Sequence, residues 1–220
     1  FMNFDIKWFL ELFLIVLPFV GLTIKISIIS LVLTFVLSVL ISMIRYYKVK
    51  FINRFLNLFV TFFRATPLVA QLFILYFGLP NIIPSLQNMS AIQATIIALT
   101  LNTSSFMSEN FRAALESVDI GQVEACYSMG MTKTQVMKRT IFPQAFIVAL
   151  PSIGNHFIGI IKGSSLGFTV GLMDIMAAAK IEAALSLRFF EAYLCVIVIY
   201  LVLVICLEKL QKLLENKIQI

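Results

Sequence analysis

The chain has 220 residues, of which 60% are hydrophobic and 13% are charged, and its formal net charge is +6 at pH 7. Soluble domains contain about 45–50% apolar and about 25% charged residues, and a chain this short has too little interior to shield so many apolar side chains from water. The composition excludes a soluble globular enzyme, a disordered segment and a nucleic-acid-binding module as first hypotheses, and it indicates an integral membrane protein.

Segments without charged residues predict where the chain crosses the membrane. They cover residues 26–44, 65–108, 140–161 and 192–207. A helix needs about 20 residues to cross a bilayer, so the second segment is long enough for two helices, and the Gly- and Pro-containing stretch 78–84 separates them. We therefore expect an all-α integral membrane protein with five transmembrane helices, at about 22–44, 53–76, 89–114, 138–160 and 189–210.

An apolar stretch at 8–18 precedes the first predicted span and contains Trp8 and Pro18. Tryptophan is enriched at the membrane interface, and proline often ends a helix. The stretch therefore predicts either an interfacial lead-in or an extension of the first helix.

The positions of lysine and arginine predict the orientation. With five spans, residues 45–54, 109–139 and 209–217 lie on one side and carry eleven of the 17 positive residues, whereas the other side carries four. Cytoplasmic loops hold the excess of positive charge. The N-terminus is therefore predicted outside and the C-terminus in the cytoplasm, with residues 1–220 forming one multi-pass domain in the cytoplasmic (plasma) membrane.

The sequence lacks the common motifs of nucleotide and metal chemistry. It contains no GxxxxGK[ST] loop and no HExxH motif, and it has one histidine, so we expect no metal ion and no nucleotide site in this chain. Residues 163–167 do fit the GxSxG pattern of serine hydrolases, with His156 as the candidate base. An intramembrane serine hydrolase is therefore an alternative, although no orienting acid is evident.

Polar side chains inside the predicted spans mark candidate sites because they are costly in lipid. Asn102 and Ser105 share a helix face, where they either bind a zwitterionic substrate or hold helices together. Glu109 and Arg112 have the same spacing and predict a structural ion pair.

Pro67 predicts a kink in the second span, because it frees a backbone carbonyl. Arg64 stands three residues earlier. Arg64 either anchors this kink or lines a pathway, and the sequence leaves both roles open.

The stretch 115–143 is predicted to be a cytoplasmic loop that contains a short helix. Gly121 can begin this helix, and Gly130 stands where a left-handed residue would end it. One face of the helix would carry small residues that another protein can approach closely. The alternative is an amphipathic connector on the membrane surface. The candidate contact residues are Gly121, Glu124, Ala125, Cys126, Ser128, Gly130 and Pro143.

This loop resembles the EAA loop of ABC-importer permeases. The family pattern is Glu-Ala-Ala, a glycine five residues beyond the first alanine, and then Ile/Leu-x-Pro, which Glu124-Ala125-Cys126, Gly130 and Ile141-Phe142-Pro143 match here. Cys126 replaces the second alanine, which exchanges one small residue for another. Further matching stretches run in order through residues 20–210, at 21–24, 63–73, 76–80, 101–112, 150–155 and 162–166. Together they are similar to the polar amino-acid subfamily, the permeases like those for histidine, glutamine, arginine and cystine.

The resemblance implies a type I permease fold and the other parts of such a transporter. These permeases form homodimers or heterodimers. Two ATPase subunits, which hold ATP and Mg, bind on the cytoplasmic side, and an extracytoplasmic amino-acid-binding protein delivers the substrate. The chain would then be a transport subunit and not an enzyme, with the loop at 115–143 coupling it to the ATPase.

Glycines recur at 159, 163, 167 and 171, which suits either close helix packing or a flexible gate. The polar residues at 162–165 inside this repeat favour a break in the helix that faces a cavity.

The resemblance also bears on the substrate. An acidic residue is common in the family at the places of His156 and Gly163, and both acids are absent here. This argues for a neutral or zwitterionic amino acid, such as cystine, although His156 alternatively is a packed, hydrogen-bonded histidine. The candidate residues of the substrate pathway are Arg64, Thr66, Gln71, Asn102, Ser105, Asn155, His156, Lys162, Gly163, Ser164 and Ser165. A stand-alone secondary amino-acid transporter or channel is the main alternative function.

Overall fold

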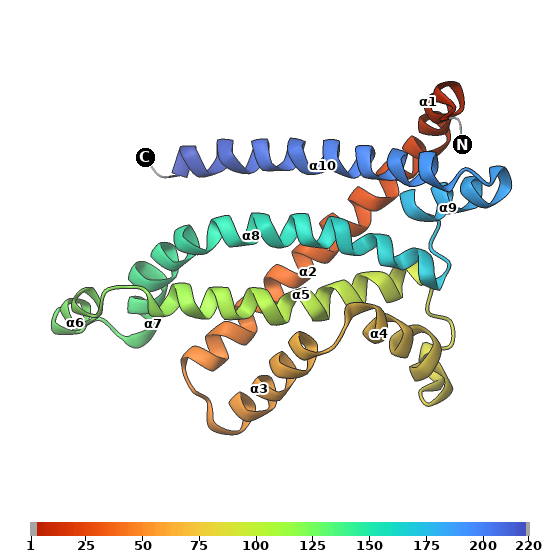
Figure 1. Cartoon of the computed structure of the whole chain (residues 1–220). Coiled ribbons are helices and arrows are strands. Elements are labelled where there is room, and N and C mark those ends of the chain that lie inside the picture. The colour runs from red at the N-terminus through yellow and green to blue at the C-terminus, as the bar shows by residue number, and fades with distance from the viewer. Residues whose placement is uncertain (1–3, 219–220) are drawn as a thin grey trace.

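Three long helices lie side by side at the centre of the molecule: α2 (Val20–Tyr46), α5 (Ala91–Glu116) and α8 (Phe142–Ser164) (Figure 1). The computed structural model describes residues 4–218, and every regular element within that range is helical. The all-α prediction is therefore confirmed for the described residues.

A stripe of small hydroxyl residues on α2 explains how closely the central helices pack. In a membrane, small residues let helix backbones approach one another, which takes the place of the hydrophobic effect. Several of the hydroxyls bond to carbonyls of their own helix, so that burying them is tolerated. The buried members of the stripe are Thr23, Ser27, Ser30, Thr34, Ser38 and Ser42.

Helix α1 (Ile6–Val16) continues through a 3-10 turn, Leu17–Phe19, into α2. Together they form a helical segment of 41 residues, Ile6–Tyr46. Pro18 lies in the 3-10 turn and has no N–H, so the α-helical hydrogen bonding is interrupted between α1 and α2. Of the two alternatives for residues 8–18, the structure therefore contains the extended first helix.

The second predicted span, 53–76, is not one continuous helix. Helix α3 (Lys50–Ala65) ends at Thr66, which is extended, and α4 (Leu68–Phe73) begins after Pro67. A π turn, Ile74–Gly78, and a 3-10 turn, Leu79–Asn81, continue it, and the two halves are bent by 109°. The kink expected at Pro67 is confirmed, and it is a complete break in the helix because proline disfavours the helical conformation at the residue before it.

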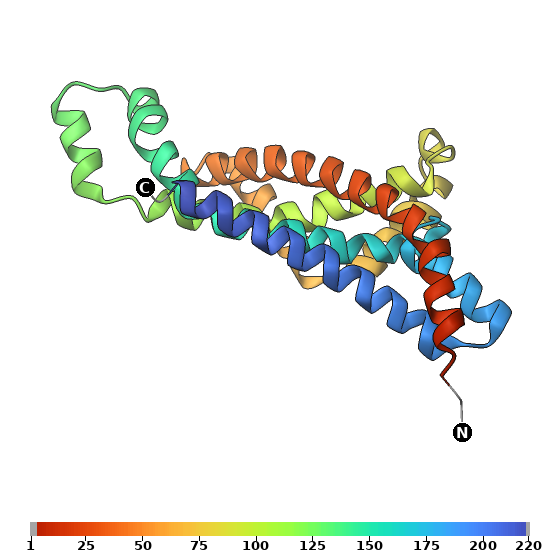
Figure 2. The ribbon, with the colours of Figure 1, turned by 90° about the horizontal axis from the view of Figure 1, so that it is seen from above.

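The loop predicted at 115–143 holds two short helices, α6 (Ile120–Ser128) and α7 (Lys133–Val136). A π turn, Met137–Ile141, joins α7 to α8. Helices α6 and α7 project beyond the long helices, at the end of the molecule where the chain leaves α10 (Phe189–Ile218) (Figures 1 and 2).

The opposite end of the molecule is built by α1, α9 (Ile175–Ser186) and the beginning of α10 (Figure 1). A 3-10 turn, Ser165–Val170, joins α8 to this region. Leu12 and Val16 of α1 pack against Ala179 of α9 and Ala192 of α10 in one apolar cluster. Asp5 and Arg188 form an ion pair beside it, so both ends of the sequence contribute to this cluster.

Three helical segments are long and apolar enough to cross a membrane: Ile6–Tyr46, Lys133–Val170 and Phe189–Lys217. The bent pair of α3 and α4 makes a possible fourth. Helix α5 has 26 residues but carries more polar side chains than the others. The count of five spans and the orientation of the termini stay predictions.

Candidate functional site

The bend between α3 and α4 leaves a backbone carbonyl unpaired inside the predicted second span. Pro67 has no N–H, so the carbonyl of Phe63 receives no helix hydrogen bond. Gln71 Nε2 and Asn102 Nδ2 each donate to that oxygen at 3.1 Å. Gln71 also donates to the Thr66 carbonyl at 3.0 Å and to the Thr66 hydroxyl at 2.7 Å, and its oxygen accepts from Asn102 at 3.0 Å. Thr66, Gln71 and Asn102 therefore form what we call the kink clamp.

The kink clamp contains three of the residues predicted to line the substrate pathway. Their polar groups bond to one another and to backbone, which satisfies the requirement that non-helical backbone at membrane depth be hydrogen-bonded. The predicted neighbour Ser105 is buried and donates to the Asn102 carbonyl at 2.6 Å. The geometry accounts for these four residues as helix-stabilising groups.

One carboxylate, Glu109 of α5, binds arginines from three helices. It lies 2.7 Å from Arg45 of α2, 3.0 Å from Arg112 of α5 and 3.7 Å from Arg64 of α3. The predicted pair of Glu109 and Arg112 is confirmed, and Glu116 adds a second acid 2.7 Å from Arg112. We call Glu109 and its three arginines the arginine cluster. It joins α2, α3 and α5.

Arg64 has an exposed side as well as a bound one. Its guanidinium lies 5.6 Å above the ring of Phe106, and its side chain is 48% exposed. A cation over an aromatic face is stabilised by the ring quadrupole. Arg64 therefore fastens α3 to α5 and still borders the open surface of the chain.

A second polar group joins α5 to α8. Asn110 of α5 lies 3.0 Å from His156 Nε2 and also donates to the Ser152 hydroxyl. His156 is thus hydrogen-bonded, as the packed-histidine alternative expects. Ser152 and His156 are four residues apart and so point the same way from α8.

The side of α8 that carries Ser152 and His156 is exposed farther along the helix. Asn155, Gly159 and Lys162 are exposed, and a methyl group placed on Gly159 would meet no atom within 4 Å. Polar residues in an exposed stripe on a membrane helix face a partner or a water-filled cavity. Of the predicted pathway residues, Asn155, His156 and Lys162 share this stripe.

The C-terminal end of α8 is the break that the sequence predicts. The helix changes to a 3-10 turn at Ser165 and stops at Gly171, whose φ of 87° favours glycine. Ser164 and Ser165 donate to carbonyls of their own turn, and Leu99 covers Gly163. The repeated glycines thus differ in role, with packing at Gly163 and a left-handed turn at Gly171.

Beyond this break, Asp174 begins α9 and lies in a protein interior. Its Oδ1 accepts from the N–H of Ala177, as an N-cap does, while its Oδ2 has no partner among the described residues. Removal from water raises the pKa of Asp174 to about 6. The connection between the 3-10 turn and α9 therefore contains a carboxyl group whose pKa is above the usual range of aspartate.

The predicted contact residues of the loop lie mainly on the outside of α6. Glu124, Ala125 and Ser128 are exposed, and Ile120 and Met129, at the two ends of α6, have 73% and 84% of their surface exposed. Gly130 has a φ of 77°, so the predicted left-handed end of this helix is confirmed. Helix α6 thus presents a mixed apolar and polar face away from the long helices.

Cys126 and Gly121 complete the predicted set on α6, and Pro143 stands apart from it. Cys126 is half-buried, with its Sγ 3.2 Å from the hydroxyl of Thr140. Gly121 lies in the first turn of α6, whereas Pro143 lies in the first turn of α8. The structure therefore brings six of the seven loop residues to one short helix and its end.

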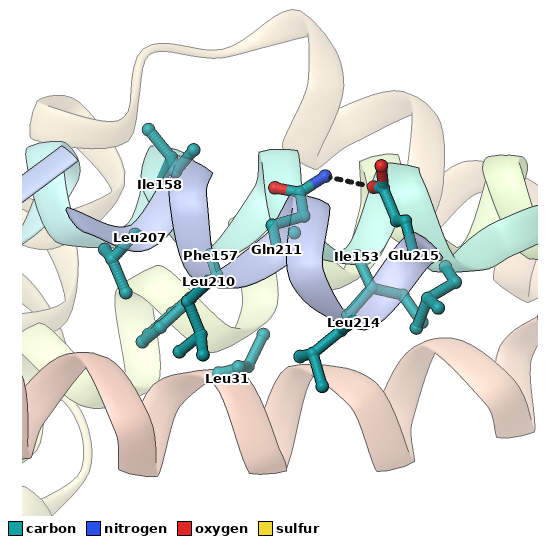
Figure 3. Close-up of a pocket in the computed structure, with 11 residues that line it drawn as sticks. Leu31, Ile153, Phe157, Ile158, Leu207, Leu210, Gln211, Leu214 and Glu215 are labelled. Atoms are coloured by element: carbon teal, nitrogen blue, oxygen red, sulfur yellow. Dashed lines mark hydrogen bonds between the residues drawn. The ribbon is translucent and has the colours of Figure 1, made fainter. Parts of the chain in front are cut away.

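A cavity of about 220 Å³ lies between α2, α8 and α10 (Figure 3). Leucine and isoleucine side chains line most of it, while Gln211 and Glu215 bond to each other at 2.7 Å. Gln211 also donates to the Pro151 carbonyl at 3.1 Å, and its amide lies directly against Gly154. Gln211 therefore fastens α10 to the middle of α8.

Several residues of these contacts escaped sequence reasoning. Arg45 and Asn110 were assigned only to a loop and to a span, because their partners are 64 and 46 residues away. The spacing of Ser152 and His156, four residues apart on one helix, is a signal that could have indicated their shared face. Gln211 gave no signal, because a single glutamine near a helix end is ordinary.

Comparisons with known proteins agree with this geometry. Residues 34–220 match the family described as "Binding-protein-dependent transport system inner membrane component". The "Probable amino-acid ABC transporter permease protein PatM" of Vibrio harveyi is 45% identical over 99% of this chain and 97% of its own length. The "Probable amino-acid permease protein YxeN" of Bacillus subtilis is 39% identical over 96% of this chain and 95% of its own length.

Relatives named for single amino acids are also similar. The "L-cystine transport system permease protein TcyL" and the "Arginine transport system permease protein ArtQ", both of Bacillus subtilis, are 30% and 31% identical over 91% and 99% of this chain, and 86% and 99% of their own lengths. A chain in the crystal structure of an amino acid ABC transporter with histidines superposes with a TM-score of 0.90 at 30% identity, covering 98% of this chain and 100% of that one.

Proposed function

Because the chain belongs to the family of binding-protein-dependent transport system inner membrane components, and is the non-catalytic permease subunit of an amino-acid ABC importer in the inner membrane, we propose how its parts carry out transport. It crosses the membrane five times, with α3 and α4 together as the second span. The exposed stripe of α8 and the neighbouring side of α5 border the substrate pathway. Helix α6 docks on the ATPase.

The proposed orientation has the N-terminus outside and the C-terminus in the cytoplasm. It is supported by the excess of positive residues near α6, the turn between α2 and α3, and the end of α10. Helix α6 and the C-terminal end of α10 lie at one end of the molecule, and α1 lies at the other (Figure 1). This arrangement puts the docking helix on the side where ATP is available.

The docking role of α6 is carried by one observation: this short helix stands outside the long helices with its apolar residues exposed. Ile120, Tyr127 and Met129 have no described neighbours that bury them. Exposed apolar residues with small ones between them are the composition of a contact surface. The proposed contacts are those of the EAA-like loop, Gly121, Glu124, Ala125, Cys126, Ser128, Gly130 and Pro143.

Family membership implies ATPase and binding-protein partners. We place ATP and Mg on the ATPase subunits, with no cofactor in this chain. A second permease protomer, identical or not, would face the exposed stripe of α8 and close the pathway. This would cover Asn155, Gly159 and Lys162, which a single chain leaves open.

The proposed substrate is a neutral or zwitterionic polar amino acid, such as cystine. The open stripe of α8 carries Lys162 and the hydrogen-bonded His156 but no carboxylate, so a cation would find no counter-charge there. The hydrogen-bonding groups of Asn155 and Asn110 suit an amino acid whose own charges balance. Relatives named for cystine and for arginine leave this preference to experiment.

The test is transport by the reconstituted complex. The permease, its ATPase and its binding protein are placed in liposomes with cystine, glutamine or arginine, and uptake and phosphate release are measured together. We expect ATP-dependent uptake and a stimulation of phosphate release by the loaded binding protein. Uptake without ATP would instead indicate a secondary transporter, and a preference for arginine would contradict the proposed substrate class.

A further inference from the structure

Helix α6 is fastened to α8 by side chains as well as by the chain that connects them. Gln144, in the first turn of α8, donates from Nε2 to Oε1 of Gln122 on α6 at 2.7 Å. The same nitrogen donates to the carbonyl of Thr140 at 3.0 Å. We call this contact of Gln122, Gln144 and Thr140 the glutamine bridge.

The backbone around the bridge explains why Gln144 must donate. Thr140 lies in the π turn Met137–Ile141, four residues before Gln144, so its carbonyl faces the first turn of α8. The Thr140 carbonyl can only accept, so the atom of Gln144 that faces it is the nitrogen. Gln122 must then present its oxygen. The direction of the hydrogen bond between the two glutamines is therefore fixed.

Two of the three residues of the bridge, Gln122 and Thr140, are held in place by other contacts. The N–H of Gln122 bonds to the Asp119 carboxylate, which caps the first turn of α6. Thr140 is bound a second time through its hydroxyl, which lies 3.2 Å from the sulfur of Cys126 on α6. One side-chain contact, from Cys126 to Thr140, thus joins α6 to the π turn, and one, from Gln122 to Gln144, joins α6 to α8. A short helix held at two points moves with the element that holds it.

Helix α8 leads from the bridge to the exposed stripe. Gln144 and His156 lie on this one helix, 12 residues apart, which corresponds to about 18 Å along its axis. Two further connections join α6 to the long helices. Val123 and Cys126 of α6 pack against an apolar cluster that includes Val136, Met137 and Ala145. The backbone runs through Gly130 at a positive φ and then through α7. A glycine loop transmits movement poorly because its backbone is conformationally permissive.

We infer, on the basis of the docking role proposed for α6, that Gln144 is the positioning residue that transmits displacement of α6 to α8 through its hydrogen bond to Gln122. The glutamine bridge fixes the angle between the docking helix and the helix that borders the pathway. It contacts neither substrate nor nucleotide. Its loss separates the hydrolysis of ATP from the movement of α8.

Two substitutions of equal charge and nearly equal size test the bridge. Gln144→Glu removes the donor and places a carboxylate against the Thr140 carbonyl, whereas Gln122→Glu keeps an acceptor facing Gln144. In liposomes with the ATPase and the binding protein, Gln144→Glu should lower the number of amino acids transported per ATP hydrolysed by about fivefold, the factor that one net hydrogen bond represents. Gln122→Glu should leave this ratio within about twofold of the unchanged protein.

A third variant tests the same hydrogen bond in case Gln144→Glu does not fold. Gln122→Ala removes only the acceptor, on an exposed surface of α6, and should lower the ratio as Gln144→Glu does. Each complex is also checked for bound ATPase subunits and for its melting temperature. Equal ratios in Gln122→Ala and the unchanged protein, or equal loss in the two glutamate variants, would overturn the bridge. Absence of stimulated uptake in the unchanged complex would instead refute the importer function itself.

Discussion

Arg45 of α2 and Glu109 of α5 are joined by a hydrogen bond of 2.7 Å although 64 residues separate them in the sequence. The side chain of Arg45 is 12% exposed, and it also donates to Asn57 of α3 at 2.9 Å. An ion pair removed from water is expensive to break, because the remaining charge is left without compensation. Three helices therefore depend on one carboxylate.

Replacing that carboxylate should destabilise the protein. Glu109→Gln leaves Arg45, Arg64 and Arg112 without their shared acid, and we expect a loss of about 3 kcal/mol in the free energy of unfolding. The matched control is Glu116→Gln, whose half-exposed pair with Arg112 is worth about 0–1 kcal/mol. Melting temperatures of the purified variants in detergent measure both. Equal losses would show that the arginine cluster has no special role.

The kink clamp predicts a structural effect for a polar residue in the third predicted span. Asn102→Leu removes one donor from the Phe63 carbonyl and one from Gln71, at an expected cost of about 1–3 kcal/mol. Ser105→Ala, which removes a hydroxyl bonded only within its own helix, is the control and should cost less. Melting temperature and uptake are measured on the same preparations. Lost uptake at an unchanged melting temperature would assign Asn102 to substrate binding instead.

Gly154 provides a test of the contact between α8 and α10. A methyl group at this position would overlap the amide of Gln211, so Gly154→Ala should expel that side chain and break its bond to Pro151. We expect a destabilisation of about 1–3 kcal/mol, visible as a lower melting temperature. Gly159→Ala, on the open side of the same helix, should change the melting temperature little. When Gln211 is also replaced by alanine, Gly154→Ala should lower the melting temperature less, because the overlapping amide is no longer present.

Asp174 predicts how stability depends on pH. Its pKa is raised to about 6 by burial, so the folded state binds a proton more tightly than the unfolded state. Protonation of Asp174 therefore adds to the free energy of unfolding below about pH 4. This contribution, on the order of 3 kcal/mol, is lost as the pH rises through 6. Asp174→Asn keeps the N-cap and removes the charge, so it should flatten this part of the profile. A melting temperature that falls equally with pH in both proteins would contradict this origin.

The exposed stripe of α8 predicts a change of substrate preference. His156→Glu introduces a carboxylate beside Asn155 and should shift uptake towards arginine relative to cystine by about tenfold, equivalent to about 1.4 kcal/mol. His156→Gln preserves a partner for Asn110 without a charge and is the matched control. Competition between the labelled amino acids in liposomes measures the ratio. An unchanged preference in both variants would place His156 outside the pathway.

Much of the fold could be predicted from the distribution of charges and apolar residues. The helix predicted at 89–114 is α5, Ala91–Glu116, which begins where Ser90 and Gln93 form a capping box. The left-handed end of α6 followed from Gly130 in the same way. The bend at Pro67 was expected, but its size was not, because the angle depends on where Gln71 and Asn102 can reach.

The candidate site was predictable only where spacing along one helix carried the information. The pair of Glu109 and Arg112 is such a case. The arginine cluster, the glutamine bridge and the contact of Gln211 with Pro151 join residues from different helices, and the sequence does not state which helices meet. The side chains that satisfy broken backbone are therefore found only in the folded chain.

The apolar cluster that α1 forms with α9 and α10 constrains the order of events during biosynthesis. Asp5 and its partner Arg188 are 183 positions apart, so at about 5–20 residues per second the ribosome needs roughly ten to forty seconds to deliver the second half of this contact. Throughout that interval α1 has emerged without the helices that bury Leu12 and Val16. We expect lipid to solvate α1 meanwhile, so that α10, synthesised more than 170 residues later, completes the packing of α1.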